Sequence, residues 1–198
     1  PFMELRLRVR DKDGGNERDV LARVRPDTVD LSAHAGLVAL PAGLRARAAQ
    51  VRSLVVASHQ LEELPAWLGE LGGLEELRVG GVDYHRPCPL AALPAAVGAL
   101  TRLQTLHVRH CPEITALPAG LAALTGLRDL DLAGCRGLAE VPAWVLDLPR
   151  LAVPFTELRV RVRDKDGGNE RDVPARVRPD AVDLSAHTGL VALPEGLR

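Results

Sequence analysis

The sequence predicts an α/β solenoid, in which stacked repeats place a parallel β-sheet on one face and short helical or 3₁₀ segments on the other. Three observations support this prediction. A pair of apolar residues recurs along the 198-residue chain, a Leu-Pro step follows most of these pairs, and a segment of 45 residues occurs twice. A short repeat cannot bury its apolar side alone, so copies must stack to form a continuous core.

The apolar pairs mark the expected strands. Their two members are separated by one position, so they point to the same side of a strand. Successive pairs are 24, 25, 23, 29, 24, 28 and 24 positions apart. The pairs are Leu5/Leu7, Val29/Leu31, Leu54/Val56, Leu77/Val79, Leu106/Val108, Leu130/Leu132, Leu158/Val160 and Val182/Leu184.

The Leu-Pro steps mark the expected return of the chain over the core. Proline fixes φ and lacks an N–H, so it suits a turn or the first position of a short helical segment. The residues that follow, such as "AWLGEL" and "AGLAAL", have apolar residues at helical spacing. The steps lie at Leu40-Pro41, Leu64-Pro65, Leu93-Pro94, Leu117-Pro118, Val141-Pro142 and Leu193-Pro194.

The duplication sets the long period of the chain. Residues 1–45 return as residues 154–198 with six differences, and the offset of 153 positions equals six short repeats. We therefore predict a single solenoid over 1–198 with about eight repeats, made of a six-repeat unit (1–153) and a near-identical copy of 1–45 (154–198). Neither end reads as the polar cap that a solenoid needs. A longer array, a recombined sequence and head-to-tail assembly of such ends all remain open.

The repeat motif resembles a known family. "LQTLHVRHC" from Leu103 and "LRDLDLAGC" from Leu127 both have the form L-x-x-L-x-L-x-x-C. This pattern resembles leucine-rich repeat proteins, specifically the short 23–24-residue subclass found in plant intracellular Ras-group-related proteins and in bacterial effectors. The resemblance covers essentially the whole chain. It implies a horseshoe with the parallel β-sheet on the concave face, and a bacterial, effector-like protein that binds other proteins.

Composition excludes several classes of function. The chain has 25 basic and 26 acidic residues and a formal net charge of −1, which argues against a nucleic-acid partner. No apolar run approaches the length that spans a bilayer, so we expect no membrane partner. Only three cysteines are present, which favours a reducing compartment. We therefore expect a cytoplasmic protein, with delivery into a host cell if the effector resemblance holds.

Two segments contain residues that could hold a metal. In the long repeat, a loop carries Tyr84, the only tyrosine, with His85 and Cys88, and His110-Cys111 lies one repeat later. His and Cys could supply part of a zinc site. The duplicated "DKDGGNE" resembles a fragment of a calcium loop, but Gly15 stands at the third ligand position. The preferred interpretations are a surface loop and a polar turn, so we expect no metal and no cofactor.

No catalytic set is apparent. The chain lacks a G-x-S-x-G motif and a Walker-type phosphate loop. Cys111 and His110 are neighbours on an expected strand, so they point to opposite faces. We expect Cys111 and Cys135 to bond loop backbone, and we expect that the protein is not an enzyme.

The residues between the core positions define the candidate binding face. Arginine forms paired contacts with carboxylates, so a face of mixed charge can bind a protein by charge complementarity. The alternative is a solvated face whose rows neutralise each other, as with Arg109 beside Asp129 and Asp131. The predicted partner-binding residues are Arg6, Arg8, Asp30, Val55, Glu76, Arg78, His107, Arg109, Asp129, Asp131, Arg159, Arg161 and Asp183.

The predicted function is a non-catalytic protein–protein interaction through the concave face. One alternative is a structural module that self-associates head to tail through its duplicated ends. Another is the substrate-recruiting part of a larger enzyme, such as a bacterial ubiquitin ligase effector. The identity of the partner does not follow from the sequence.

Overall fold

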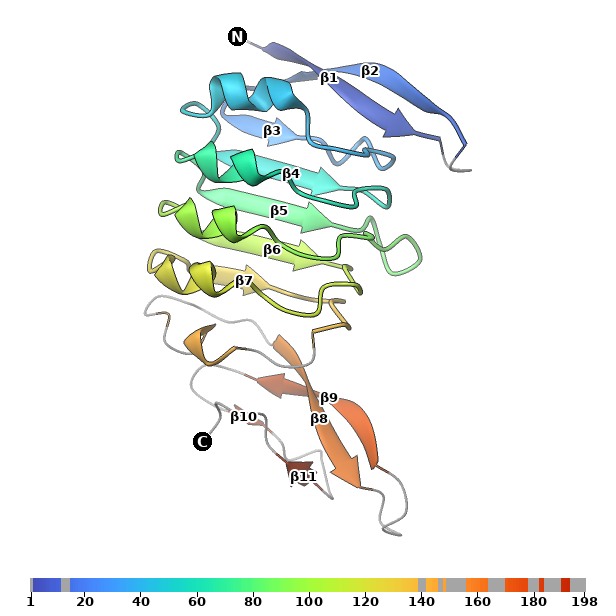
Figure 1. The fold of residues 1–198 in the computed structure, drawn as a ribbon, viewed down its shortest axis with the longest axis vertical. Coiled ribbons are helices and arrows are strands. Elements are labelled where there is room, and N and C mark those ends of the chain that lie inside the picture. Colours follow the sequence, from blue (N-terminus) through green and yellow to red (C-terminus); the bar gives the residue numbers. More distant parts are fainter. Residues whose placement is uncertain are drawn as a thin grey trace.

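The computed structural model describes residues 2–11, 15–138, 142–145, 148, 156–163, 170–177, 182–183 and 190–192. The strands form three sheets, of two, five and four strands (Figure 1). The five-stranded sheet is the centre of the fold, and its strands follow one another in chain order.

The central sheet is parallel. It consists of β3 (Thr28–Asp30), β4 (Ser53–Ala57), β5 (Glu76–Gly80), β6 (Thr105–Arg109) and β7 (Asp129–Asp131). The apolar positions align in register, so that Leu54, Leu77, Leu106 and Leu130 form one row across four strands. This confirms the strands that the apolar pairs predict in the middle of the chain.

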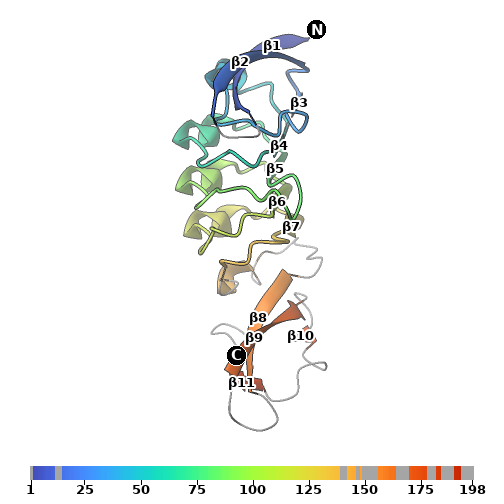
Figure 2. The same cartoon turned by 90° about the vertical axis from the view of Figure 1, so that its right-hand side faces the viewer.

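Short 3₁₀ helices follow the strands. They are η1 (Ala42–Arg47), η2 (Ala66–Glu70), η3 (Ala95–Ala99), η4 (Ala119–Ala123) and η5 (Ala143–Val145). Each of the first four begins directly after the proline of a Leu-Pro step, whose φ lies between −69° and −65°. Each buries one apolar residue, Leu44, Leu68, Val97 or Leu121. Figure 2 shows these helices on one side of the repeats and β3 to β7 on the other, as the Leu-Pro steps predict.

The core between the sheet and the helices is aliphatic and includes a ladder of thiols. Cys88, Cys111 and Cys135 are buried and unpaired. The Cys88 thiol bonds the carbonyl of Leu61 at 3.2 Å, and the thiols of Cys111 and Cys135 likewise bond backbone carbonyls. This confirms the structural role expected for Cys111 and Cys135. The neighbouring thiols of Cys135 and Cys88, together with burial, raise the pKa of the Cys111 thiol.

The first apolar pair does not form a parallel repeat strand, so that prediction is wrong. β1 (Met3–Arg10) pairs antiparallel with β2 (Glu17–Val24), with Leu5 opposite Ala22 and Leu7 opposite Val20. β1 alternates apolar and polar residues over eight positions, β2 places Val20, Ala22 and Val24 on one side, and a short polar connection lets the two strands pair locally. The backbone N–H of Asp11 donates to the Asn16 carbonyl at 3.0 Å, which agrees with a polar turn. Residues 12–14 lie outside the described residues.

The hairpin of β1 and β2 covers one end of the core, so the expectation of an uncapped N-terminal end is also wrong. Its inner side chains Leu5, Leu7 and Ala22 are buried in the same cluster as the repeats, and Figure 1 shows it beside β3. The Arg10 amide donates to the Gly36 carbonyl at 2.8 Å. A Cβ at Gly36 would lie 2.2 Å from the Arg10 carbonyl oxygen, so glycine permits this close approach.

The duplicated segment forms the same hairpin a second time. β8 (Thr156–Arg163) pairs antiparallel with β9 (Glu170–Val177) in the equivalent register. β10 (Val182–Asp183) and β11 (Leu190–Ala192) complete a sheet in the order β10-β9-β8-β11. The parallel strands predicted at Leu158/Val160 and Val182/Leu184 are therefore wrong. In the first copy, β3 pairs with β4, whereas residues 154–198 contain no second copy of Ser53–Ala57.

Candidate protein-interaction face

One face of the parallel sheet points away from the 3₁₀ helices, and we call it the open face. Within the described residues, no other helix or strand covers it (Figure 2). Strand register arranges its side chains in three rows. The first row is Thr28, Ser53, Glu76, Thr105 and Asp129; the second is Asp30, Val55, Arg78, His107 and Asp131; the third is Ala57, Gly80 and Arg109.

The open face brings together eight of the thirteen residues predicted from the sequence. They are Asp30, Val55, Glu76, Arg78, His107, Arg109, Asp129 and Asp131. Their placement follows from the parallel register, which sets equivalent positions of successive repeats side by side.

The other five predicted residues do not join this face. Arg6 and Arg8 are exposed on β1, opposite Leu21 and Asp19 of the hairpin. Arg159 and Arg161 belong to β8 and Asp183 to β10, in the four-stranded antiparallel sheet. The cause is the antiparallel pairing, which removes both hairpins from the parallel sheet.

Ion pairs order the charged side chains of the open face. Arg109 Nε lies 2.6 Å from Asp131 Oδ2, and Arg78 Nε lies 2.5 Å from Glu76 Oε1. His107 Nε2 lies 2.8 Å from Asp129 Oδ2. The contacts of His107 and Arg109 agree with the expected neutralisation between neighbouring strands, and Arg109 takes Asp131 of its two expected partners. Arg78 and Glu76 instead pair within β5.

The arginines are the more exposed partners in their ion pairs. The Arg109 side chain is 53% exposed and that of Asp131 only 16%. The Arg78 side chain is 49% exposed and that of Glu76 31%. An approaching molecule therefore meets the guanidinium groups before the carboxylates.

A small apolar area adjoins these arginines. Val55 is half-buried and lies between Asp30 and Arg78 in the second row. Ala57 lies beside Gly80, whose φ is +158°. A Cβ at Gly80 would lie 2.0 Å from the Arg109 carbonyl oxygen, so the two strands require glycine here.

The loop after β5 contributes an exposed aromatic group, Tyr84, which the sequence suggests only as a neighbour of a metal site. The Tyr84 ring stacks edge-on against His110, with 5.1 Å between ring centroids. The Arg136 guanidinium lies 4.6 Å from the Tyr84 centroid. The sequence does contain a signal for this exposed group. Tyr84 is the only tyrosine of the chain and lies in a loop that lengthens its repeat, and tyrosine and arginine are enriched at interfaces.

The zinc interpretation of this loop finds no support in its geometry. Cys88 is buried and bonds the Leu61 carbonyl. In the part of the chain that the structure describes, no three His, Cys, Asp or Glu side chains are grouped to hold a metal ion. An ion pair between Asp83 and Arg86 holds the loop, and the Arg86 hydrogen bond lowers the pKa of Asp83.

The comparisons with known proteins found similar chains among solved structures. No family model matches the chain, and no curated protein matches it. Among solved structures, it is similar to the leucine-rich repeat domain of the type III effector XopL, with 28% identity and a TM-score of 0.49. The match covers 63% of this chain and 40% of that chain.

The class of protein follows from the molecule itself. Consecutive repeats that each supply one parallel strand and one 3₁₀ helix define a solenoid, and these repeats carry the leucine-rich pattern. None of the helices in the described residues has the length and hydropathy needed to cross a bilayer.

Proposed function

We propose that the open face binds a protein partner without catalysis, and that the partner presents acidic side chains next to a small aliphatic one. The observation that carries this proposal is the exposure of Arg109 and of Arg78, which lies beside Val55, with each guanidinium held by a less exposed carboxylate. Arginine is enriched at binding hot spots, and a side chain held in place loses less entropy on binding.

The internal ion pairs leave donors for a partner. Arg109 uses Nε and Nη2 on Asp131. A guanidinium has five N–H donors, so others remain for a second carboxylate. An exposed ion pair contributes at most about 1 kcal/mol, so a partner can share or replace one at small cost.

Selection from a displayed library of random peptides tests this proposal. We expect the full chain to enrich peptides with clustered Asp or Glu beside Val, Leu or Ile. The Arg78→Glu/Arg109→Glu variant should lose these peptides, because like charges would then face each other. The double variant Arg47→Glu/Arg128→Glu is the matched control, since both arginines are exposed and lie off the open face.

Two results would count against the proposal. One is an enriched pool without acidic character. The other is equal retention of the selected peptides by the open-face variant and by the wild-type chain. A fluorescence polarisation titration of one selected peptide measures the difference, and circular dichroism verifies that the variants fold.

Head-to-tail association is a second candidate, favoured by the exposed face of the first hairpin. Leu21 and Phe2 are large apolar residues that remain exposed there. Light scattering of the full chain over a concentration series should show a mass that increases with concentration and returns to the monomer with Leu21→Asp. A constant monomer mass for the unmodified chain excludes this association.

A further inference from the structure

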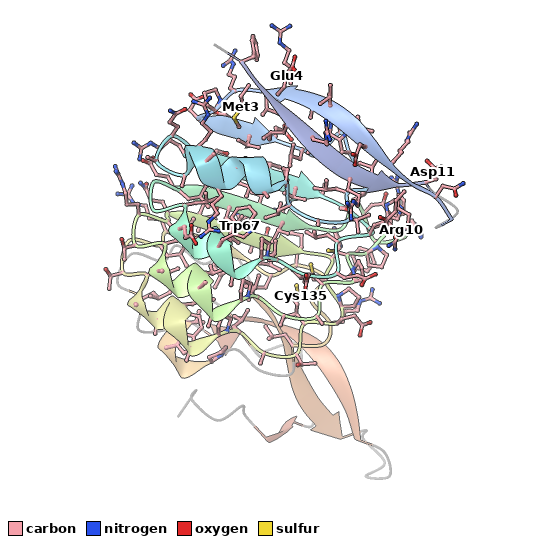
Figure 3. The ribbon with its side chains drawn as sticks, turned by 45° about the horizontal axis from the view of Figure 1, so that its top comes forward. Met3, Glu4, Arg10, Asp11, Trp67 and Cys135 are labelled. Carbon is pink, nitrogen blue, oxygen red and sulfur yellow. The ribbon has the colours of Figure 1, made fainter. Side chains whose placement is uncertain are left out.

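A cavity separate from the open face lies between the first hairpin and the loops that follow β3, β4 and β5. Its volume is about 510 Å³, within the usual range for small-molecule sites. Five of its lining side chains are basic, namely Arg10, Arg18, His34, His59 and Arg86, and its lining contains no Asp or Glu. Figure 3 shows Arg10 and Asp11 at the end of the hairpin opposite Met3.

Arg10 is held in place at this cavity. Its Nη2 donates to Glu17 Oε1 at 2.7 Å, and its Nη1 donates to Gln60 Oε1 at 3.3 Å. Both acceptors lie outside the lining of the cavity. The guanidinium is therefore oriented before any ligand arrives, which lowers the entropy cost of binding.

Arg18 and Arg86 have donors available. Arg18 Nε lies 3.7 Å from Asp11 Oδ1, which is too far for a hydrogen bond. Arg86 uses Nε and Nη2 on Asp83 Oδ2. Its Nη1 makes no contact with Asp83 and remains for a ligand.

His59 adds an unsatisfied polar atom to the lining residues of the cavity. Its Nδ1 atom is buried and has no hydrogen-bond partner among the described residues. A buried polar atom without a partner costs about 1–3 kcal/mol, so such atoms call for an explanation. A ligand oxygen reaches this atom only if the His59 ring turns toward the cavity that it lines.

We propose that this cavity binds a phosphate monoester. Three guanidinium groups and two imidazoles supply more donors than the two oxygens of a carboxylate accept, and they suit the three terminal oxygens of a phosphate. The aliphatic side chains of Val9, Val20 and Ala33 also line the cavity and accommodate the carbon part of the ester.

The duplication predicts how many sites each chain has. Arg163, Arg171 and His187 repeat Arg10, Arg18 and His34 at the offset of 153 positions. Residues 154–198 contain no counterpart of His59 or Arg86. The complete set therefore occurs once, and we expect one ligand per chain.

Titration calorimetry of the full chain with phenyl phosphate at low ionic strength tests the proposal. We expect saturable binding of one molecule per chain, and weaker binding of benzoate, which has the same ring and a carboxylate. Arg18→Gln should raise the Kd about tenfold, since a hydrogen bond from a charged group is lost. The side chain of Arg18 is largely exposed, so the variant should fold normally.

The control variant is Arg128→Gln, which makes the same charge change at an exposed site away from the cavity. It should leave the Kd within about twofold, because Arg128 does not line the cavity and makes no contact with a ligand there. The ring ¹⁵N resonances of His59 should also shift on titration with phenyl phosphate. Absence of saturable heat, equal effects of the two variants, or benzoate binding as tight as phenyl phosphate would each overturn the proposal.

Discussion

Adjacent residues of β2 provide a sharp test of the hairpin. Ala22 is 5% exposed and packs into the core, whereas Leu21 is 66% exposed on the outer face. Introducing an aspartate at each position makes the same chemical group buried in one variant and solvated in the other. We expect Ala22→Asp to destabilise the hairpin and Leu21→Asp to be nearly neutral.

The magnitude follows from the cost of placing a carboxyl group in the core. An aspartate with an ordinary pKa near 3.9 must be protonated to enter an apolar site, which costs about 4 kcal/mol at pH 7. The loss of stability cannot exceed the free energy needed to detach the hairpin from the core, because detachment exposes the new aspartate to water. A solvated substitution such as Leu21→Asp should change stability by no more than about 0.5 kcal/mol.

The assay combines urea unfolding with amide hydrogen exchange. Ala22→Asp should lower the urea midpoint at pH 7 and should lower it less at pH 5, because protonation costs less near the ordinary pKa. Amide protection should fall at Glu17–Val24 and persist in β4, β5 and β6, since the hairpin can open locally.

Equal destabilisation by the two aspartates would refute the hairpin geometry, because it would mean that both side chains occupy similar surroundings. A larger loss for Leu21→Asp than for Ala22→Asp would show that β2 presents its other face to the core.

Three further predictions concern the loops and the core. Gly36→Ala should cost about 1–3 kcal/mol through its clash with Arg10, whereas Gly15→Ala, with no atom within 4 Å of the new Cβ, should be neutral; equal urea midpoints would contradict this. The buried thiols around Cys111 should react with Ellman's reagent slowly in the native protein and fully in guanidinium, and rapid native reaction would argue against the ladder. The Arg86 hydrogen bond lowers the pKa of Asp83, so the ion pair should be fully formed above the ordinary carboxyl pKa and should be lost as pH falls through the pKa of the folded protein. Arg86→Ala should therefore raise the NMR titration midpoint of Asp83, and an unchanged midpoint would disprove this.

The middle of the fold could be predicted from the sequence because its signals are local. Leu54 and Val56 share one side of a strand in any register, and the proline of a Leu-Pro step starts a 3₁₀ helix through its own φ. The proximity of Arg109 to Asp131 also follows from the repeat, because the parallel register aligns Asp131 with His107 and so places it diagonally next to Arg109 on the same face.

The hairpins were missed because Leu5/Leu7 has the same spacing as the pairs in the repeats. The discriminating signal lay in "ERDVLARV", whose Val20, Ala22 and Val24 share one side of an extended segment and make a second strand available nearby. An antiparallel partner within reach of a short connection forms before a parallel partner more than 20 residues away.

The repeat period, the apolar side of each strand and the positions of the 3₁₀ helices follow from the order of residues alone, because they depend on spacing and on backbone geometry. The partner of each strand depended on which segment the folded chain brought within reach, as β3 and its copy β10 show by pairing with different strands. The basic cavity likewise draws its lining from five separate segments, so only the tertiary structure assembles it.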